Sequence, residues 1–188
     1  TAAIAFGGES QPGARVAVAE SFDGSSWTEG PDLNTARTNT GGTGTQTATL
    51  SFGGVVPGGP PAPKTNVTEE YDGSSWTNSN NMNNARSELG STGIQTAAVA
   101  MGGEEPPGAV TRCETYDGST WSTSPATMGN ARTGAAAAGS STASFIAGGP
   151  SASALTEEYN VTAMTITAAA WASGGSIPVA GKQVTGAG

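Results

Sequence analysis

The residues of this sequence that could do acid–base chemistry are carboxylates, because its 188 residues include no histidine. Three pairs of neighbouring glutamates stand out, at 69–70, 104–105 and 157–158, and two carboxylates that flank a sugar can hydrolyse a glycosidic bond. The first and third pairs lie in predicted strands, where neighbouring side chains point to opposite faces. Each of these pairs therefore places one acid inward and one outward. Only Glu104 and Glu105, in a predicted loop, could share a cation or a ligand.

Other catalytic and cofactor chemistry has little support. Without histidine there is no Ser-His-Asp triad and no histidine-bearing zinc site. The glycine pairs also lack the GxxxxGK[ST] pattern of a phosphate-binding loop. We therefore expect no catalytic residues, no bound metal and no cofactor. The lone cysteine, Cys113, excludes an intramolecular disulfide and is expected to be a small core residue.

Charge and composition narrow the class of protein. The formal charge of −8 argues against a nucleic-acid partner, because phosphate binding needs a basic patch, and it favours solubility. No apolar run approaches the length of a membrane span, so no membrane insertion is expected, and no signal peptide opens the sequence. With 29 glycines and 11 prolines, the composition is typical of an all-β chain of short strands and tight turns.

An internal repeat organises the whole chain, which we take as one domain, 1–188. Its units are 1–46, 47–95, 96–142 and 143–188, and the last is degenerate, with Lys182 where the others have arginine. Each full unit carries a diglycine, then an acid, an aromatic residue, a tryptophan and an arginine. These repeat residues, expected to be structural, are Glu20, Phe22, Trp27 and Arg37, then Glu69, Tyr71, Trp76 and Arg86, then Glu114, Tyr116, Trp121 and Arg132.

Each unit divides into four strand-like pieces. In "TATLSFGG", Leu50 and Phe52 alternate with small residues, a period-2 pattern that leaves one face open to close approach by a neighbouring sheet. The Asp-Gly in "EEYDGSSWT" predicts a hairpin. A two-residue turn would put Trp76 opposite Glu69, and a four-residue loop would put it opposite Tyr71; both put all three on one face, directed inward. Four strands per unit, at this period, indicate a β-propeller.

These residues resemble the kelch repeat, in which a diglycine is followed by Glu-x-Tyr-Asp, a tryptophan, and Met-x-x-x-Arg. The third unit matches with Gly102-Gly103, Glu114, Tyr116-Asp117, Trp121, Met128 and Arg132. The resemblance covers three units well and the fourth poorly. It implies an all-β, kelch-type β-propeller of four blade-like repeats, with the repeat glutamate and arginine paired between blades. Kelch propellers usually have more than four blades, so a larger ring is one reading; in the other, "KQVTGAG" at 182–188 completes the first blade.

Recognition is expected in the loops after each diglycine, at 9–18, 55–66, 104–111 and 150–156, which would share one rim. The candidate binding residues are Glu9, Gln11, Arg15, Lys64, Asn66, Glu104 and Glu105. The alternative is that these loops are neutral connectors.

The near-identical units also resemble propeller segments of virion appendage proteins of marine bacteriophages. That resemblance implies a non-enzymatic structural or adhesion part, such as a tail fibre or capsid decoration, in a virion or another extracellular appendage. Its partners would be other structural subunits, or a surface glycan or protein receptor, and assembly into oligomers stays open. The alternatives are an intracellular kelch adaptor that binds proteins, and a non-catalytic segment of a carbohydrate-active enzyme.

Overall fold

The computed structural model describes residues 2–149, 154–161 and 170–173, and this part of the chain consists of strands and turns without a helix. The predicted all-β class is therefore confirmed. The strands are β1 (Ala3–Phe6), β2 (Glu9–Ser10), β3 (Ala14–Arg15), β4 (Ala19–Phe22), β5 (Trp27–Glu29), β6 (Gly41–Thr45), β7 (Ala48–Phe52), β8 (Thr68–Tyr71), β9 (Trp76–Ser79), β10 (Gly90–Ile94), β11 (Ala97–Met101), β12 (Glu104–Glu105), β13 (Gly108–Ala109), β14 (Cys113–Tyr116), β15 (Trp121–Thr123), β16 (Ala136–Gly139), β17 (Ala143–Ala147), β18 (Thr156–Asn160) and β19 (Ala170–Ser173).

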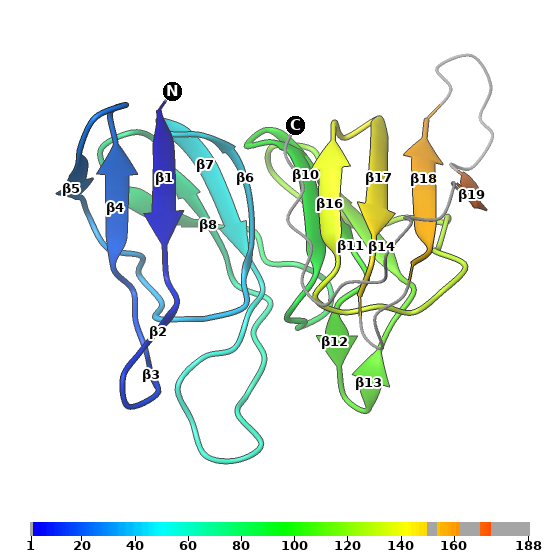
Figure 1. The fold of residues 1–188 in the computed structure, drawn as a ribbon, viewed down its shortest axis with the longest axis horizontal. Coiled ribbons are helices and arrows are strands. Elements are labelled where there is room, and N and C mark those ends of the chain that lie inside the picture. The colour runs from blue at the N-terminus through cyan, green and yellow to red at the C-terminus, as the bar shows by residue number, and fades with distance from the viewer. Residues whose placement is uncertain (1, 150–153, 162–169, 174–188) are drawn as a thin grey trace.

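The strands form four small antiparallel sheets that follow one another along the chain (Figure 1). Sheet 1 has the order β1-β4-β5, sheet 2 β6-β7-β8-β9, sheet 3 β10-β11-β14-β15 and sheet 4 β16-β17-β18-β19. Two further hairpins, β2-β3 and β12-β13, project from the ends of sheets 1 and 3. The sheets are offset from the sequence units, because β6, β10 and β16 come at the end of one unit and pair with the diglycine strand of the next. Within the described residues, sheet 1 has no strand in that position.

The Asp-Gly hairpins adopt the second of the two predicted registers. Tyr71 pairs directly with Trp76, so the connection is the four-residue loop 72–75. The two rings lie 5.1 Å apart between centroids. Asp72 fixes the loop, because its Oδ1 accepts hydrogen bonds from the backbone N–H groups of Ser74 and Ser75, each over 2.8 Å. Such a side-chain-to-backbone turn explains why aspartate opens this loop in all three units.

Neighbouring sheets pack face to face through the alternating positions that the sequence predicted. Phe52 of sheet 2 lies 4.8 Å from Trp121 of sheet 3 between ring centroids, and Phe6 of sheet 1 lies 5.1 Å from Trp76 of sheet 2. The small alternates allow this approach: Ala98 is fully buried in the same cluster as Phe52.

Sheets 3 and 4 pack in the same way around Val99, Met101 and Ile146, which are fully buried. Cys113 is fully buried here, as predicted for a core residue. A glycine at position 90 leaves room for Ile146, because a Cβ there would lie 2.9 Å from Cδ1 of Ile146.

The first unit differs from the prediction that its aromatic residues point inward. Trp27 is 51% exposed, and Glu20 is also exposed, whereas their counterparts Trp76 and Glu69 are buried. The reason is positional. The face that carries Trp76 is covered by sheet 1, and no sheet of the described residues precedes sheet 1 to cover Trp27.

Two expectations fall outside the described residues. One is the beginning of the fourth loop, 150–153, and the other is the proposed completion of sheet 1 by residues 182–188.

Candidate functional site

The repeat glutamates and arginines form three buried ion pairs between consecutive sheets, as the kelch resemblance implied. In each pair the arginine follows one sheet and the glutamate lies in the next sheet along the chain. The pairs are Arg37–Glu69, Arg86–Glu114 at 2.9 Å and Arg132–Glu157 at 2.7 Å. Glu20 makes no such pair within the described part of the chain.

Backbone N–H groups also donate hydrogen bonds to each of these carboxylates. Glu69 accepts hydrogen bonds from the backbone N–H groups of Asn34 (2.6 Å) and Thr35 (3.1 Å) as well as from the Arg37 guanidinium. These donors belong to the "LNTAR" segment, so the segment that supplies the cation also supplies the N–H groups. Burial lowers the pKa of Arg37, and the neighbouring Glu69 carboxylate opposes that shift.

Each arginine also holds the diglycine turn of the next sheet. Arg86 donates through its second terminal nitrogen to the carbonyl of Gly102 over 2.6 Å and to that of Arg112 over 3.1 Å. Both Arg86 and Glu114 have fully buried side chains. Each oxygen of the Glu114 carboxylate accepts a hydrogen bond, from the Asn83 N–H and from Arg86, and the side chain is closed to solvent, so this ion pair holds two sheets together.

The loops after the diglycines gather at one end of the molecule. The β2-β3 hairpin, the loop 55–66 and the β12-β13 hairpin all lie at the lower end in Figure 1. Isolated bridges connect two of them to the segments that precede sheets 2 and 3, since Val55 pairs with Thr38 and Glu104 pairs with Ser87, and Val55 also pairs with Lys64 within its own loop. We call these three segments the loop rim.

The structure brings most of the candidate binding residues to the loop rim. Lys64 and Glu104 form an ion pair at 3.4 Å that links two neighbouring loops. Glu105 is paired instead with Arg112, at 2.7 Å. On the β2-β3 hairpin, Glu9 lies opposite Arg15.

The remaining two candidates, Gln11 and Asn66, differ in whether their side chains are free to meet a ligand. Gln11 is exposed at the tip of the β2-β3 hairpin. Asn66, two residues before β8, is hydrogen-bonded within the fold instead: its side-chain amide donates to the Met82 backbone carbonyl over 2.9 Å, and its backbone carbonyl accepts from the Met82 N–H over 2.9 Å. Although Asn66 is the last residue of its rim loop, its polar groups are therefore used to hold the fold.

Arg112, which lies just after the β12-β13 hairpin, is a neighbour of the rim that the sequence reasoning missed. It donates to Oδ1 of Asn84 over 2.9 Å as well as pairing with Glu105, and so it joins the third loop to the preceding unit. The sequence feature that could have revealed it is its place in "EEPPGAVTR", because a short hairpin in this stretch would bring Arg112 back to the acid pair at its start.

The opposite end of the sheets carries the Asp-Gly loops. Hydrogen bonds from the second and third residues after each aspartate lower the pKa of Asp23, Asp72 and Asp117 to about 2. These exposed acids are thus committed to their own loops. No group of three or more metal-binding side chains occurs among the described residues.

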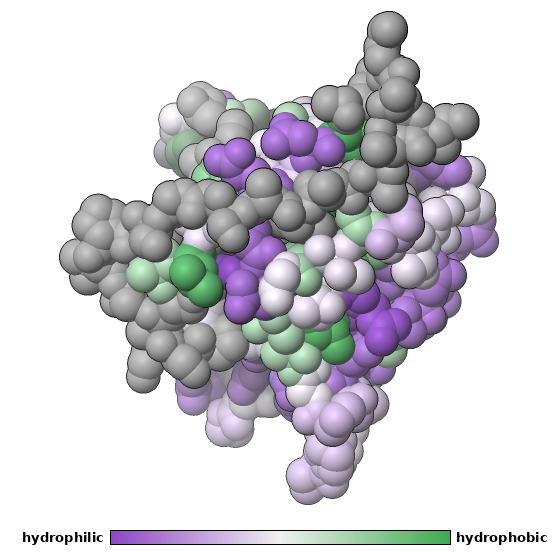
Figure 2. Space-filling view, turned by 90° about the vertical axis from the view of Figure 1, so that its right-hand side faces the viewer, coloured by the Kyte–Doolittle hydropathy of each residue, from purple (hydrophilic) through white to green (hydrophobic). Residues whose placement is uncertain are grey.

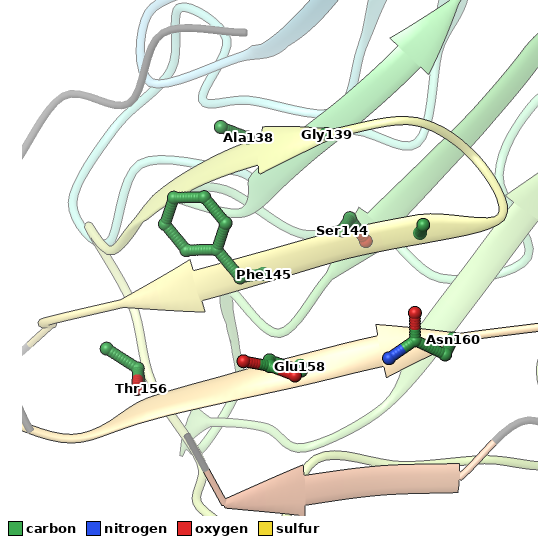
Figure 3. A pocket seen from close by; sticks show the side chains of 8 residues that line it. Ala138, Gly139, Ser144, Phe145, Thr156, Glu158 and Asn160 are labelled. Carbon is green, nitrogen blue, oxygen red and sulfur yellow. The ribbon is translucent and has the colours of Figure 1, made fainter. Parts of the chain in front are cut away.

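Two shallow hollows lie on the sheets. One, of about 350 Å³, lies between β1 and β6 and is lined by Ile4, Phe6 and Thr43 among others. The other, also of about 350 Å³, lies on the face of sheet 4, where Phe145, Glu158 and Asn160 line it (Figure 3). On the side of the molecule that Figure 2 shows, small patches of hydrophobic residues lie among hydrophilic residues.

The described residues contain no helix that is long and apolar enough to cross a membrane. No family model matches the sequence, and a search of curated proteins found no match either.

Proposed function

We propose that the four sheets are consecutive blades of a kelch-type β-propeller, and that the chain is a non-enzymatic structural or adhesion module of a virion or other extracellular appendage. In this proposal the loop rim recognises a surface glycan or a protein. The order of diglycine, Glu-x-aromatic, tryptophan and arginine supports the kelch assignment, and so does the pairing of each glutamate with the arginine of the preceding unit.

The observation that carries the binding proposal is the contrast between the sheets and their rim. Sheets 2 and 3 repeat the same register and the same buried ion pair. The loops on their rim differ in length and sequence: 55–66 is long and proline-rich, whereas 104–111 is a short acidic hairpin. A rigid frame with dissimilar loops at one end is the usual arrangement of a recognition surface.

The rim also has groups that suit a polar ligand. In the Lys64–Glu104 pair the glutamate side chain is 42% exposed, and in the Arg112–Glu105 pair the arginine is 39% exposed. Ion pairs at this exposure contribute little to stability, so a ligand can replace them at small cost. Carboxylates and guanidinium groups hydrogen-bond readily to sugar hydroxyls or to a polar protein surface.

Binding of the purified chain to a printed array of bacterial surface glycans and to purified virion proteins tests this function. The variants Lys64→Ala, Glu104→Ala and Glu105→Ala should each weaken the binding, whereas Ser122→Ala, at an exposed strand position of sheet 3, should not. Equal binding by all four would mean that the loops are connectors. Turnover of a bound glycan would overturn the non-enzymatic part of the proposal.

A further inference from the structure

Two sheet faces are left uncovered within the described residues. On sheet 1, the exposed face carries Trp27 (51% exposed) with Glu20 and the half-buried Phe22. On sheet 4, the exposed face carries Phe145 (41% exposed) and Glu158. Both are the faces that pack against a neighbouring sheet elsewhere in the molecule.

We propose that a second copy of this chain covers both faces at once, with sheet 4 of each copy packed on sheet 1 of the other. The two copies would be related by a two-fold axis and would close one ring of sheets. This association is independent of what the loop rim binds.

The two faces are the two halves of an interface that recurs within the chain. Sheet 2 presents Leu50 and Phe52 toward sheet 3, which receives them with Ala98, Tyr116 and Trp121. The exposed face of sheet 4 corresponds to the face of sheet 2 that carries Leu50, since Phe145 occupies the position of Leu50 relative to the diglycine. The exposed face of sheet 1 corresponds to the face of sheet 3 that receives Leu50 and Phe52.

The pairing within sheet 1 supports this assignment. Ala3 pairs with Phe22, which pairs with Trp27, and both Ala3 and Trp27 are exposed. In sheet 3 the same arrangement of alanine, aromatic residue and tryptophan is buried by the preceding sheet. The exposed residues Ala3 and Trp27, with Phe22 between them, are therefore of the same types as the residues that form a packed interface in sheet 3.

The arrangement of the sheets allows one partner to reach both faces. In Figure 1, sheets 1 and 4 are the two nearest the viewer, and sheets 2 and 3 lie behind them. The covered face of sheet 1 packs on sheet 2 behind it, and that of sheet 4 packs on sheet 3. The two uncovered faces are consequently on the same side of the molecule.

The hollow on sheet 4 offers a place for an aromatic side chain. In Figure 3, Phe145 and Glu158 rise from the same face of neighbouring strands, beside Ala138. Because small residues flank the phenyl ring, a tryptophan from the partner can pack against it in the way that Trp121 packs on Phe52.

The charges on the two faces predict how the association responds to salt. Glu20 lies directly opposite Glu29 in sheet 1, where sheet 2 has Glu69 opposite Asn78. Glu158 corresponds to Glu70, which accepts a hydrogen bond from the Tyr116 hydroxyl in sheet 3, so Glu158 of the partner would approach Phe22, beside this acid pair. Like charges repel and salt screens the repulsion, so the dimer should tighten as the ionic strength rises.

Sedimentation equilibrium of the purified chain at several concentrations and salt levels tests the proposal. We expect a species of twice the 18.3 kDa chain mass. The variants Trp27→Ser and Phe145→Ser should each raise the dissociation constant about tenfold or more, because each removes an aromatic anchor. The control Ile94→Ser removes a similarly exposed apolar side chain (56% exposed) from the end of β10 in sheet 3, away from both faces, and should leave the dissociation constant unchanged.

A mixing experiment separates this arrangement from other dimers. A heterodimer of the Trp27→Ser and Phe145→Ser variants keeps one intact contact between sheets 1 and 4, so the mixture should associate more tightly than either variant alone. If mixing does not help, the faces do not meet in this way. A chain that stays monomeric at high micromolar concentration, or that forms an open series of larger species, would likewise overturn the closed two-copy ring.

Discussion

The indole N–H of Trp121 donates a hydrogen bond to the hydroxyl of Thr68, over 2.9 Å, at a buried contact between sheets 3 and 2. The equivalent group of Trp76, one sheet earlier, is buried without a partner. Position 68 in unit 2 corresponds to Ala19 in unit 1, since each pairs with the phenylalanine before the diglycine. The indole N–H of Trp76 therefore lacks a partner because the alanine at position 19 has no hydroxyl.

Replacing Ala19 with threonine should supply that hydroxyl. We expect Ala19→Thr to be more stable than Ala19→Val by about 1 kcal/mol, the net value of a buried hydrogen bond. The two variants add nearly the same volume to a site that is 2% exposed, so their difference isolates the hydroxyl. Urea denaturation followed by tryptophan fluorescence measures it, and equal midpoints would contradict the assignment.

Removing one partner of a buried ion pair should be costly. Arg86→Met leaves the Glu114 carboxylate buried with the backbone N–H of Asn83 as a donor but without its cation, and should lower the free energy of unfolding by about 3–5 kcal/mol. Arg112→Met breaks a partly exposed pair and should cost less than about 1 kcal/mol.

The double variant Arg86→Met/Glu114→Gln provides the check on that explanation. Because it removes both charges, it should be less destabilised than the sum of the two single variants. Additive losses in urea denaturation would show that the two side chains contribute separately.

Acid should destabilise the protein through the Asp-Gly loops. The folded pKa of Asp23, Asp72 and Asp117 is about 2, below the ordinary value of 3.8. Between these two values the unfolded chain binds more protons than the folded one, so the free energy of unfolding falls as the pH is lowered from 3.8 to 2. Above 3.8 this contribution is fully present.

Asparagine variants test the source of this acid sensitivity. Replacing the three aspartates with asparagine keeps an acceptor for the loop N–H groups but removes the titration. Thermal melts of this triple variant should depend less on pH in that window than those of the parent chain. Ser122→Ala, at an exposed position outside the loops, is the control and should leave the pH dependence of the melting temperature unchanged.

The diglycine turn should tolerate no side chain at its first position. Gly53 has φ of +66°, and a Cβ there would lie 2.6 Å from the backbone oxygen of Arg86. Gly53→Ala should therefore cost more than the roughly 1–2 kcal/mol of a left-handed backbone alone. Gly59→Ala, where a Cβ meets nothing within 4 Å, should be neutral or stabilise by up to about 1 kcal/mol. Comparable melting temperatures for the two variants would contradict this view of the turn.

Much of the sheet structure could be predicted because it depends on short-range patterns. Alternation in "TATLSFGG" and the Asp-Gly loop determine strands and hairpins locally. The pairing of Glu69 with Arg37 was expected only from the resemblance to the kelch repeat. The choice between hairpin registers could not be made, because both keep Tyr71 and Trp76 on one face. It depended on Asp72 accepting two backbone hydrogen bonds, which requires the longer loop.

The candidate site was less predictable because it depends on contacts between units. Lys64 and Glu104 come together only once sheets 2 and 3 are stacked, and nothing local distinguishes Asn66, which is used internally, from a rim residue. The exposure of Trp27 has the same cause. Its sequence context matches that of Trp76, and only the absence of a covering sheet within the described residues separates them.

The direction of the ion pairs has a consequence for synthesis. In all three pairs the arginine precedes its glutamate, by 32, 28 and 25 residues. A ribosome therefore releases each cation, and the backbone donors beside it, before the carboxylate that they will bind. Each newly made sheet meets a finished docking site on the sheet before it, so the order of translation matches the order in which the sheets can assemble.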